Sequence, residues 1–255
     1  MRRSTTKNLL SVGLLTLGSL ALTPSCADNN SSLFVIGVIA LDASACVAKN
    51  DTSSPMLAAG TLDTAFANSY TAFVLVGNQL TQRGSREQLR TETSRISLRG
   101  AEVTLTTLDG KELGTYSTVG TGFVDASQGD APSYAAMAVN VIPPALGSSA
   151  AVKAARVVLA KIRVFGDTLG NTSITSSELD FPINICEGCL INYDTADPLS
   201  PDAFRCSAAG STATTTETEP CAFGQDKKFS CTTCAAAYEI CRDPAVNPSF
   251  TPATP

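Results

Sequence analysis

The residues whose spacing points most directly to chemistry are the nine cysteines, and the sequence contains no histidine. Without histidine there is no Ser-His-Asp triad, no Cys-His pair and no His-ligated metal. Two Cys-x-x-Cys pairs are present, Cys186/Cys189 and Cys231/Cys234. This spacing suits a zinc ribbon, a redox-active dithiol or structural disulfides. The two pairs are further apart than is typical of a zinc ribbon, and no thioredoxin-like unit surrounds them. We therefore expect structural disulfides, with neither metal nor cofactor.

The first 25 residues predict the compartment. Arg2, Arg3 and Lys7 form a basic stretch, and residues 9–22 form an apolar stretch without any charge. This pattern is typical of a secretory signal peptide, and the apolar stretch is shorter than the roughly 20 residues that a membrane-spanning helix needs. We therefore expect residues 1–25 to be an export signal, which directs the mature chain to an oxidising compartment.

The residues after the apolar stretch allow two cleavage sites. Ser25 and Cys26, at the end of Leu22-Thr23-Pro24, resemble a bacterial lipobox. In that family the cysteine is acylated and becomes the first mature residue, which implies a palmitate-type lipid anchor on Cys26. Residues 26–32 would then be a polar tether. The alternative is ordinary cleavage after Ala27, which would remove Cys26 and release a secreted protein. By analogy with enteric lipoproteins, the absence of aspartate after Cys26 implies the outer membrane, at its periplasmic face or at the cell surface.

The other cysteines favour four disulfides. Setting Cys26 aside leaves eight, an even number in an exported protein: Cys46, Cys186, Cys189, Cys206, Cys221, Cys231, Cys234 and Cys241. Seven of these eight lie between residues 186 and 241. If all eight pair, at least one bond must leave that segment, and Cys46 is the only candidate partner. We expect Cys46 to bond to Cys186 or Cys189 and so to join the first strand to the last.

The elements that must position these cysteines are mostly strands. Alternating or continuous apolar runs predict strands at residues 33–41, 61–66, 71–76, 95–107, 116–124, 134–142, 158–164 and 174–185. Turns are expected at Gly77-Asn78 and Asp109-Gly110, a bulge near Gly100, one or two helical turns at 148–155, and an edge or break at Pro182. Many short strands with little helix predict a mainly β fold. We expect an antiparallel, immunoglobulin-like β-sandwich over residues 33–185.

A small disulfide-rich module is expected to follow at residues 186–242, and a disordered, proline-rich tail at 243–255. The runs 186–190, 220–226 and 231–234, together with 75–80, resemble uncharacterised cysteine-rich bacterial lipoproteins of myxobacterial type. That resemblance implies a cell-envelope location and no known activity.

Acidic residues dominate the charge of the chain. The formal net charge is −5, and removal of the basic signal peptide makes it more negative, which argues against nucleic-acid binding. Several carboxylates raise the question of a calcium or catalytic site: Asp194 with Asp197 and Asp202, Asp125 with Asp130, and Asp63 with Glu92. Their spacing matches no metal-binding or catalytic motif, so we expect solvated acidic loops.

These observations favour a binding or structural role over catalysis. We expect a non-enzymatic cell-envelope lipoprotein, held at the membrane by its lipid anchor, with a structural or interaction role toward an envelope protein or polysaccharide. The alternative is a secreted or surface module that binds polysaccharide or a partner protein through its loops. For that alternative the sequence offers only the scattered aromatic residues Tyr70, Phe73 and Tyr134.

Overall fold

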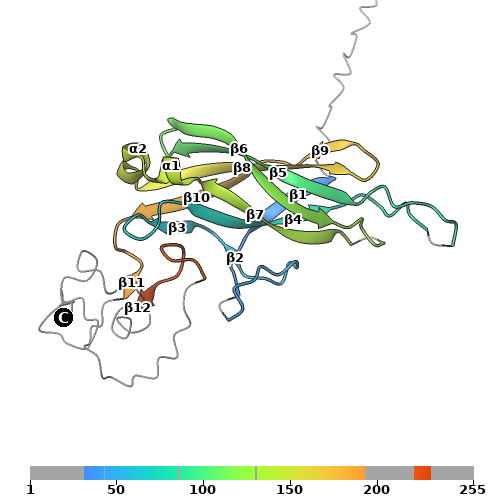
Figure 1. The fold of residues 1–255 in the computed structure, drawn as a ribbon, viewed down its shortest axis with the longest axis horizontal. Coiled ribbons are helices and arrows are strands. Elements are labelled where there is room, and N and C mark those ends of the chain that lie inside the picture. Colours follow the sequence, from blue (N-terminus) through green and yellow to red (C-terminus); the bar gives the residue numbers. More distant parts are fainter. Residues whose placement is uncertain (1–31, 43, 86, 130, 193–220, 231–255) are drawn as a thin grey trace, which may run out of the picture.

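The computed structural model describes residues 32–42, 44–85, 87–129, 131–192 and 221–230 (Figure 1). The predicted signal peptide, Cys26, nearly all of the tether and the predicted tail at 243–255 lie outside these ranges. Within the described ranges, no helix has the length and apolar character needed to cross a membrane.

Most of the described chain is in β-strands. The strands are β1 (Leu33–Ile39), β2 (Met56–Leu57), β3 (Gly60–Asp63), β4 (Tyr70–Asn78), β5 (Ile96–Thr107), β6 (Glu112–Val124), β7 (Ser133–Ile142), β8 (Val157–Thr168), β9 (Ser173–Thr175), β10 (Leu179–Cys186), β11 (Ile191–Asn192) and β12 (Phe229–Ser230). Two short helices, α1 (Pro144–Gly147) and α2 (Ala150–Ala154), precede β8. The prediction of a mainly β fold is confirmed.

The strands form two main sheets around a common core (Figure 1). One sheet has the order β2-β1-β4-β7, and the other has the order β3-β10-β8-β5-β6, with β9 pairing to β8. The structure does not confirm the immunoglobulin-like arrangement, because the second sheet curls into a half-barrel and β3 pairs with β10 in parallel. A parallel pair needs a long crossover connection, so it joins segments far apart in sequence.

The bulge predicted near Gly100 is confirmed, and it decides which side chains of β5 enter the core. The register of β5 shifts between Leu98 and Gly100 against both neighbouring strands. Ile96 and Leu98 are buried before the shift, and Val103 is buried after it on the other parity. A Cβ atom at position 100 would lie 2.2 Å from the carbonyl oxygen of Thr118, so this close approach requires glycine.

The Asp109-Gly110 turn joins β5 to β6 as predicted. Gly110 has a φ of 84°, in the left-handed region that glycine adopts at no steric cost. The Thr107 N–H donates to the Lys111 carbonyl at 2.9 Å, which closes the hairpin. The long antiparallel pair of β5 and β6 then supplies one side of the half-barrel.

The turn predicted at Gly77-Asn78 is wrong, because β4 continues through both residues. Gly77 lies against the ring of Phe34, where an added Cβ would be 2.2 Å from a ring carbon. Asn78 is fully buried, and its side-chain amide donates to the carbonyl oxygens of Ser94 and Asp125, each at 2.9 Å. Residue types that usually mark turns here serve close packing and a buried polar network instead.

Pro182 lies in β10, which is an interior strand of its sheet. It pairs with Leu159 of β8, but the parallel pairing with β3 begins only at Ile183. The side of β10 toward β3 is therefore unpaired at Pro182, which suits a residue without an N–H. β10 is therefore not the edge strand predicted from Pro182, although its side toward β3 is open at that residue.

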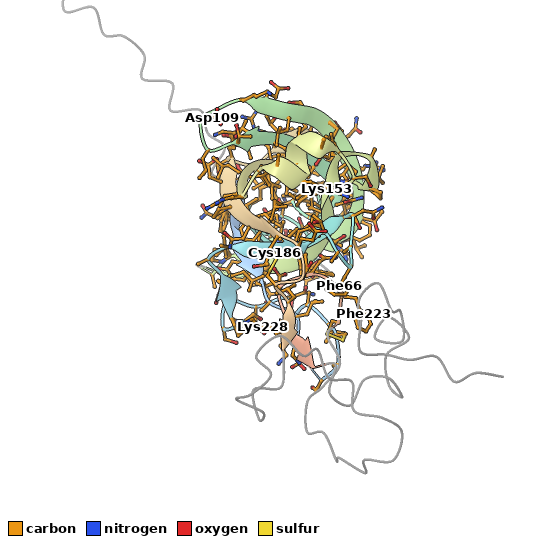
Figure 2. All side chains as sticks on the ribbon, turned by 90° about the vertical axis from the view of Figure 1, so that its left-hand side faces the viewer. Phe66, Asp109, Lys153, Cys186, Phe223 and Lys228 are labelled. Atoms are coloured by element: carbon orange, nitrogen blue, oxygen red, sulfur yellow. A yellow bond between two sulfur atoms is a disulfide. The ribbon has the colours of Figure 1, made fainter. Side chains whose placement is uncertain are left out.

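The helical turns predicted at 148–155 correspond to α2. The Ser149 side chain accepts a hydrogen bond from the Val152 N–H at 3.3 Å and so caps the helix. The Val152 side chain is fully buried, which attaches the helix to the core. Figure 2 looks at this end of the molecule, where Lys153 of α2 and Cys186 at the end of β10 both face the viewer.

Candidate functional site

The first disulfide joins Cys46 to Cys221 across 175 residues of sequence, with 5.2 Å between their Cα atoms. Cys46 therefore bonds to a cysteine of the 186–241 segment, as the count of cysteines required, but the expected partner was wrong. The reason is tertiary. The segment Cys221–Lys228 hydrogen-bonds along β3, which brings Cys221 to the loop after β1.

The second disulfide joins Cys186 to Cys189, with 5.9 Å between their Cα atoms. Gly188 has a φ of 76°, and this turn folds the chain after β10 back on itself and brings the two cysteines together. The two are therefore not free to pair with Cys46. The other predicted disulfide cysteines, Cys206, Cys231, Cys234 and Cys241, lie outside the described residues, as does Cys26.

The two disulfides differ in the chain that they close. In the chain-entropy model, a bond across 175 residues contributes about 5 kcal/mol to stability, and one across three residues contributes about 2 kcal/mol. Among the described residues, the Cys46–Cys221 bond is therefore the covalent tie between the N-terminal strands and the segment Cys221–Lys228.

Asp63, at the end of β3, supports the Cys186–Cys189 loop. Its side chain is fully buried, and Oδ1 accepts hydrogen bonds from the N–H groups of Gly188 at 2.7 Å and Ala65 at 3.1 Å. Oδ2 accepts from the N–H of Leu190 at 2.9 Å. The expectation that Asp63 belongs to a solvated acidic loop is wrong, because these backbone donors replace the water that a carboxylate needs.

Asp63 and the two cysteines also gather potential metal ligands. One carboxylate oxygen and the two sulfur atoms all lie within 4.8 Å of one another. The two sulfurs are bonded to each other, so neither is a thiolate in this state. Zinc binds thiolates, and the arrangement could hold a metal only after reduction of this disulfide.

The other carboxylates considered from the sequence do not form a shared site with Asp63. Glu92 accepts hydrogen bonds from the N–H groups of Arg83, Gly84 and Ser94, which lie in its own loop region. Partial burial acts to raise the pKa of Glu92, but the backbone donors together outweigh it and hold that pKa below its ordinary value. Asp125 pairs with Arg95 at 2.9 Å. Asp130, Asp194, Asp197 and Asp202 lie outside the described residues.

The segment Cys221–Lys228 is docked on the β domain by backbone hydrogen bonds. The Asp63 N–H donates to the Gly224 carbonyl at 2.9 Å, and the Asp226 N–H donates to the Thr61 carbonyl at 3.0 Å. Gln225 accepts from the N–H of Thr71 at 3.0 Å through Oε1. These bonds cover the open edge of β3. Figure 2 shows Phe223 of this segment beside Phe66, in the loop that follows β3.

Tyr70 and Asp226 form a polar pair where this segment meets the core. Tyr70 is fully buried, and its hydroxyl donates to the Asp226 carboxylate, with oxygen separations of 3.0 and 2.9 Å. Asp226 Oδ1 also accepts from the N–H of Thr61 at 2.8 Å. The Asp226 residue as a whole is exposed, but its carboxylate faces the buried ring, and this loss of water raises its pKa. Burial, and then the Asp226 charge, raise the pKa of Tyr70.

A cavity of about 450 Å³ lies between β1, the start of β4 and the segment Cys221–Lys228. Its wall is mostly apolar and includes Val38, Ile39, Leu57 and Phe73, while Asp226, Gln225 and Lys227 supply polar groups. A pocket of this size with an apolar wall and few polar groups is typical of small-molecule sites. Of the scattered aromatic residues, Tyr70 and Phe73 line this cavity, and Tyr134 packs against Phe34 with ring centroids 6.3 Å apart.

Most of this site was not visible in the sequence. The sequence places Asp226 shortly after Cys221, and Gly224, with a φ of 72°, lies between them. Only the docking of this segment on the β domain brings the Asp226 carboxylate to Tyr70. Comparison with known proteins adds no relative, since no protein-family model and no curated protein matches the chain. The two disulfides indicate an oxidising, extracytoplasmic environment for the folded protein.

Proposed function

We propose that this chain is an exported cell-envelope protein whose β domain binds a small, largely apolar molecule, with a role in binding and not in catalysis. The observation that carries the proposal is the cavity of about 450 Å³ bordered by the segment Cys221–Lys228. The Cys46–Cys221 disulfide holds one wall of this cavity in place. Because this wall is already fixed before a ligand binds, binding costs less conformational entropy.

The chemistry of the wall favours an apolar molecule that carries one hydrogen-bond donor or a cationic group. Asp226 Oδ1 accepts from both Thr61 and Tyr70, whereas Oδ2 accepts only the shared Tyr70 hydroxyl among the described contacts. A carboxylate has about four lone-pair sites, so Oδ2 can accept a ligand N–H. A polysaccharide would require a more polar wall, so this geometry favours a small apolar ligand over a polysaccharide.

Three eight-carbon probes test the ligand class: octylammonium, octanol and octanoate, each measured by calorimetry against the purified protein. We expect octylammonium to bind most tightly, because only it offers a positive donor to Asp226. In Asp226→Asn, which keeps Oδ1 as an acceptor for Thr61 and Tyr70, we expect the preference for octylammonium to fall by about tenfold, the equivalent of one charge-assisted hydrogen bond.

The matched control is Asp109→Asn in the β5–β6 hairpin, which removes a carboxylate away from the cavity and should leave all three affinities unchanged. Absence of binding by every probe would contradict the proposed function. Tighter binding of octanoate would show that Asp226 does not select the ligand and would point to Lys227 at the same wall.

We also propose that Cys26 carries a lipid anchor and places the β domain at the outer membrane. The resemblance of Ser25-Cys26 to a lipobox and of the chain to cysteine-rich myxobacterial lipoproteins supports this, as does an extracytoplasmic fold with disulfides. The test is the intact mass of protein purified from cell membranes. A diacyl or triacyl addition on Cys26 is expected, whereas an unmodified chain beginning at Asp28 would identify a secreted protein.

A further inference from the structure

We propose that the Cys186–Cys189 disulfide is a redox-exchange site, which small thiols open and close while the fold stays intact. The site lies at the end of β10, where Figure 2 labels Cys186. Its short loop turns at Gly188, which has a φ of 76°. Cys189 is exposed and Cys186 is half-buried, so a solvent thiol reaches Cys189 first. Exposed disulfides are the labile and reactive ones in exported proteins.

The loop is held by contacts that do not depend on its sulfur–sulfur bond. Asp63 binds the N–H groups of Gly188 and Leu190, and the Leu190 side chain is buried. On the other side, the Cys186 carbonyl accepts from the Thr64 N–H at 2.7 Å and from its hydroxyl at 2.9 Å. Reduction therefore leaves both thiols in place, facing each other and ready to re-form the bond.

Exposure alone does not distinguish this disulfide, because Cys46 of the other bond is exposed too. The difference lies in what each bond holds. Cys46–Cys221 joins segments 175 residues apart and fixes the wall of the cavity, so its loss lowers the stability of the folded state more. Cys186 and Cys189 are only three positions apart in the sequence, so reduction of their bond weakens the folded state much less.

The exchange step balances with glutathione as the thiol. A glutathione thiolate attacks Sγ of Cys189, the Cys186–Cys189 bond breaks, and Sγ of Cys186 leaves as a thiolate that takes a proton from water. A second glutathione thiolate attacks the mixed disulfide and forms glutathione disulfide, and Sγ of Cys189 leaves and is protonated. Two electrons pass from two glutathione molecules to the protein, and the reverse sequence restores the disulfide.

The test equilibrates the folded protein in glutathione buffers of graded potential, with a chelator present, and then traps free thiols with an alkylating reagent. Trypsin cleaves after Arg163 and Arg205, so Cys186 and Cys189 are released in one peptide without any other cysteine. We expect this peptide to become reduced in buffers that leave Cys46–Cys221 intact, with an unchanged far-ultraviolet circular dichroism spectrum. Reduction of both bonds together, or only with loss of the fold, would overturn the proposal.

Two single-thiol variants test which sulfur reacts. In Cys186→Ser the remaining Cys189 thiol should form a mixed disulfide with glutathione disulfide about tenfold faster than the Cys186 thiol does in Cys189→Ser, because it is more exposed. Equal rates, or a faster Cys186, would contradict the order of attack. A parallel sample contains zinc in place of the chelator. Stoichiometric zinc uptake that blocks re-oxidation there would show that the reduced cysteine pair and Asp63 form a metal site instead.

Discussion

At the scale of single residues, the buried carboxylate of Asp63 links two parts of the molecule that are remote in sequence. It accepts three backbone hydrogen bonds, two of them from the loop after β10, and it has no exposed surface. A buried carboxylate is tolerated only when donors of this kind surround it, so each bond removed leaves an unsatisfied group.

We therefore predict that Asp63→Asn lowers the free energy of unfolding by about 2–4 kcal/mol, because the new amide N–H₂ faces the N–H of Leu190 as a second donor. The measurement is urea unfolding at pH 7. Glu102→Gln, on the exposed face of β5, is the control and should change stability by less than about 0.5 kcal/mol. An equal effect of both variants would contradict the role assigned to Asp63.

Asp226 gives a prediction for pH dependence. Its pKa in the folded protein lies above the ordinary value of 3.8, because its carboxylate is partly removed from water. The folded state therefore favours the protonated form of Asp226. The stability that this group contributes is fully present below pH 3.8 and is lost as the pH rises through the folded-state pKa. Relative to the wild type, Asp226→Asn should gain stability between pH 3 and pH 7. Thermal unfolding at several pH values measures this, and a constant difference would refute it.

At the scale of elements, the bulge in β5 shows how one glycine positions a whole strand. Gly100 allows the Thr118 carbonyl to approach closely. The register shift there changes which alternate positions of β5 face the core, so that Val103 is buried after it as Leu98 is before it. Gly100→Ala should lower the free energy of unfolding by about 2 kcal/mol through overpacking. The matched control is Gly122→Ala, where an added Cβ meets Leu98 at an ordinary 3.5 Å and should have little effect. Urea unfolding of both variants distinguishes steric contact from a general intolerance of alanine.

The two disulfides make a second comparison between elements. Cys46→Ser/Cys221→Ser should lower the free energy of unfolding by about 5 kcal/mol, and Cys186→Ser/Cys189→Ser by about 2 kcal/mol, following the chain-entropy model. Denaturant unfolding of the two double variants tests the order. The first variant should also weaken octylammonium binding, because it releases the wall of the cavity, whereas the second should not.

At the scale of the whole molecule, the segment Cys221–Lys228 completes the β domain although it follows it in sequence. It covers the edge of β3 and supplies Asp226 to Tyr70. A chain that ends after Asn192 should therefore unfold at a lower temperature than Cys46→Ser/Cys221→Ser, since it loses the docking contacts as well as the disulfide. A chain that ends after Arg242, which lacks only the predicted tail, is the control and should match the full-length protein.

The sequence by itself determined the mainly β character, the bulge at Gly100 and the Asp109-Gly110 hairpin, because these depend on neighbouring residues. Alternation over a few positions, or a glycine next to an aspartate, is sufficient to encode a strand or a tight turn. The count of cysteines likewise predicted a bond from Cys46 into the later segment, provided that all eight pair, and the structure has that bond.

Only the tertiary structure decided the partner of Cys46, the burial of Asp63 and the cavity beside Tyr70. Each depends on β3, whose parallel pairing with β10 and contact with the segment Cys221–Lys228 bring together residues more than a hundred positions apart. No local pattern records such a contact, because its free energy comes from burial and hydrogen bonds that exist only after the sheets have packed.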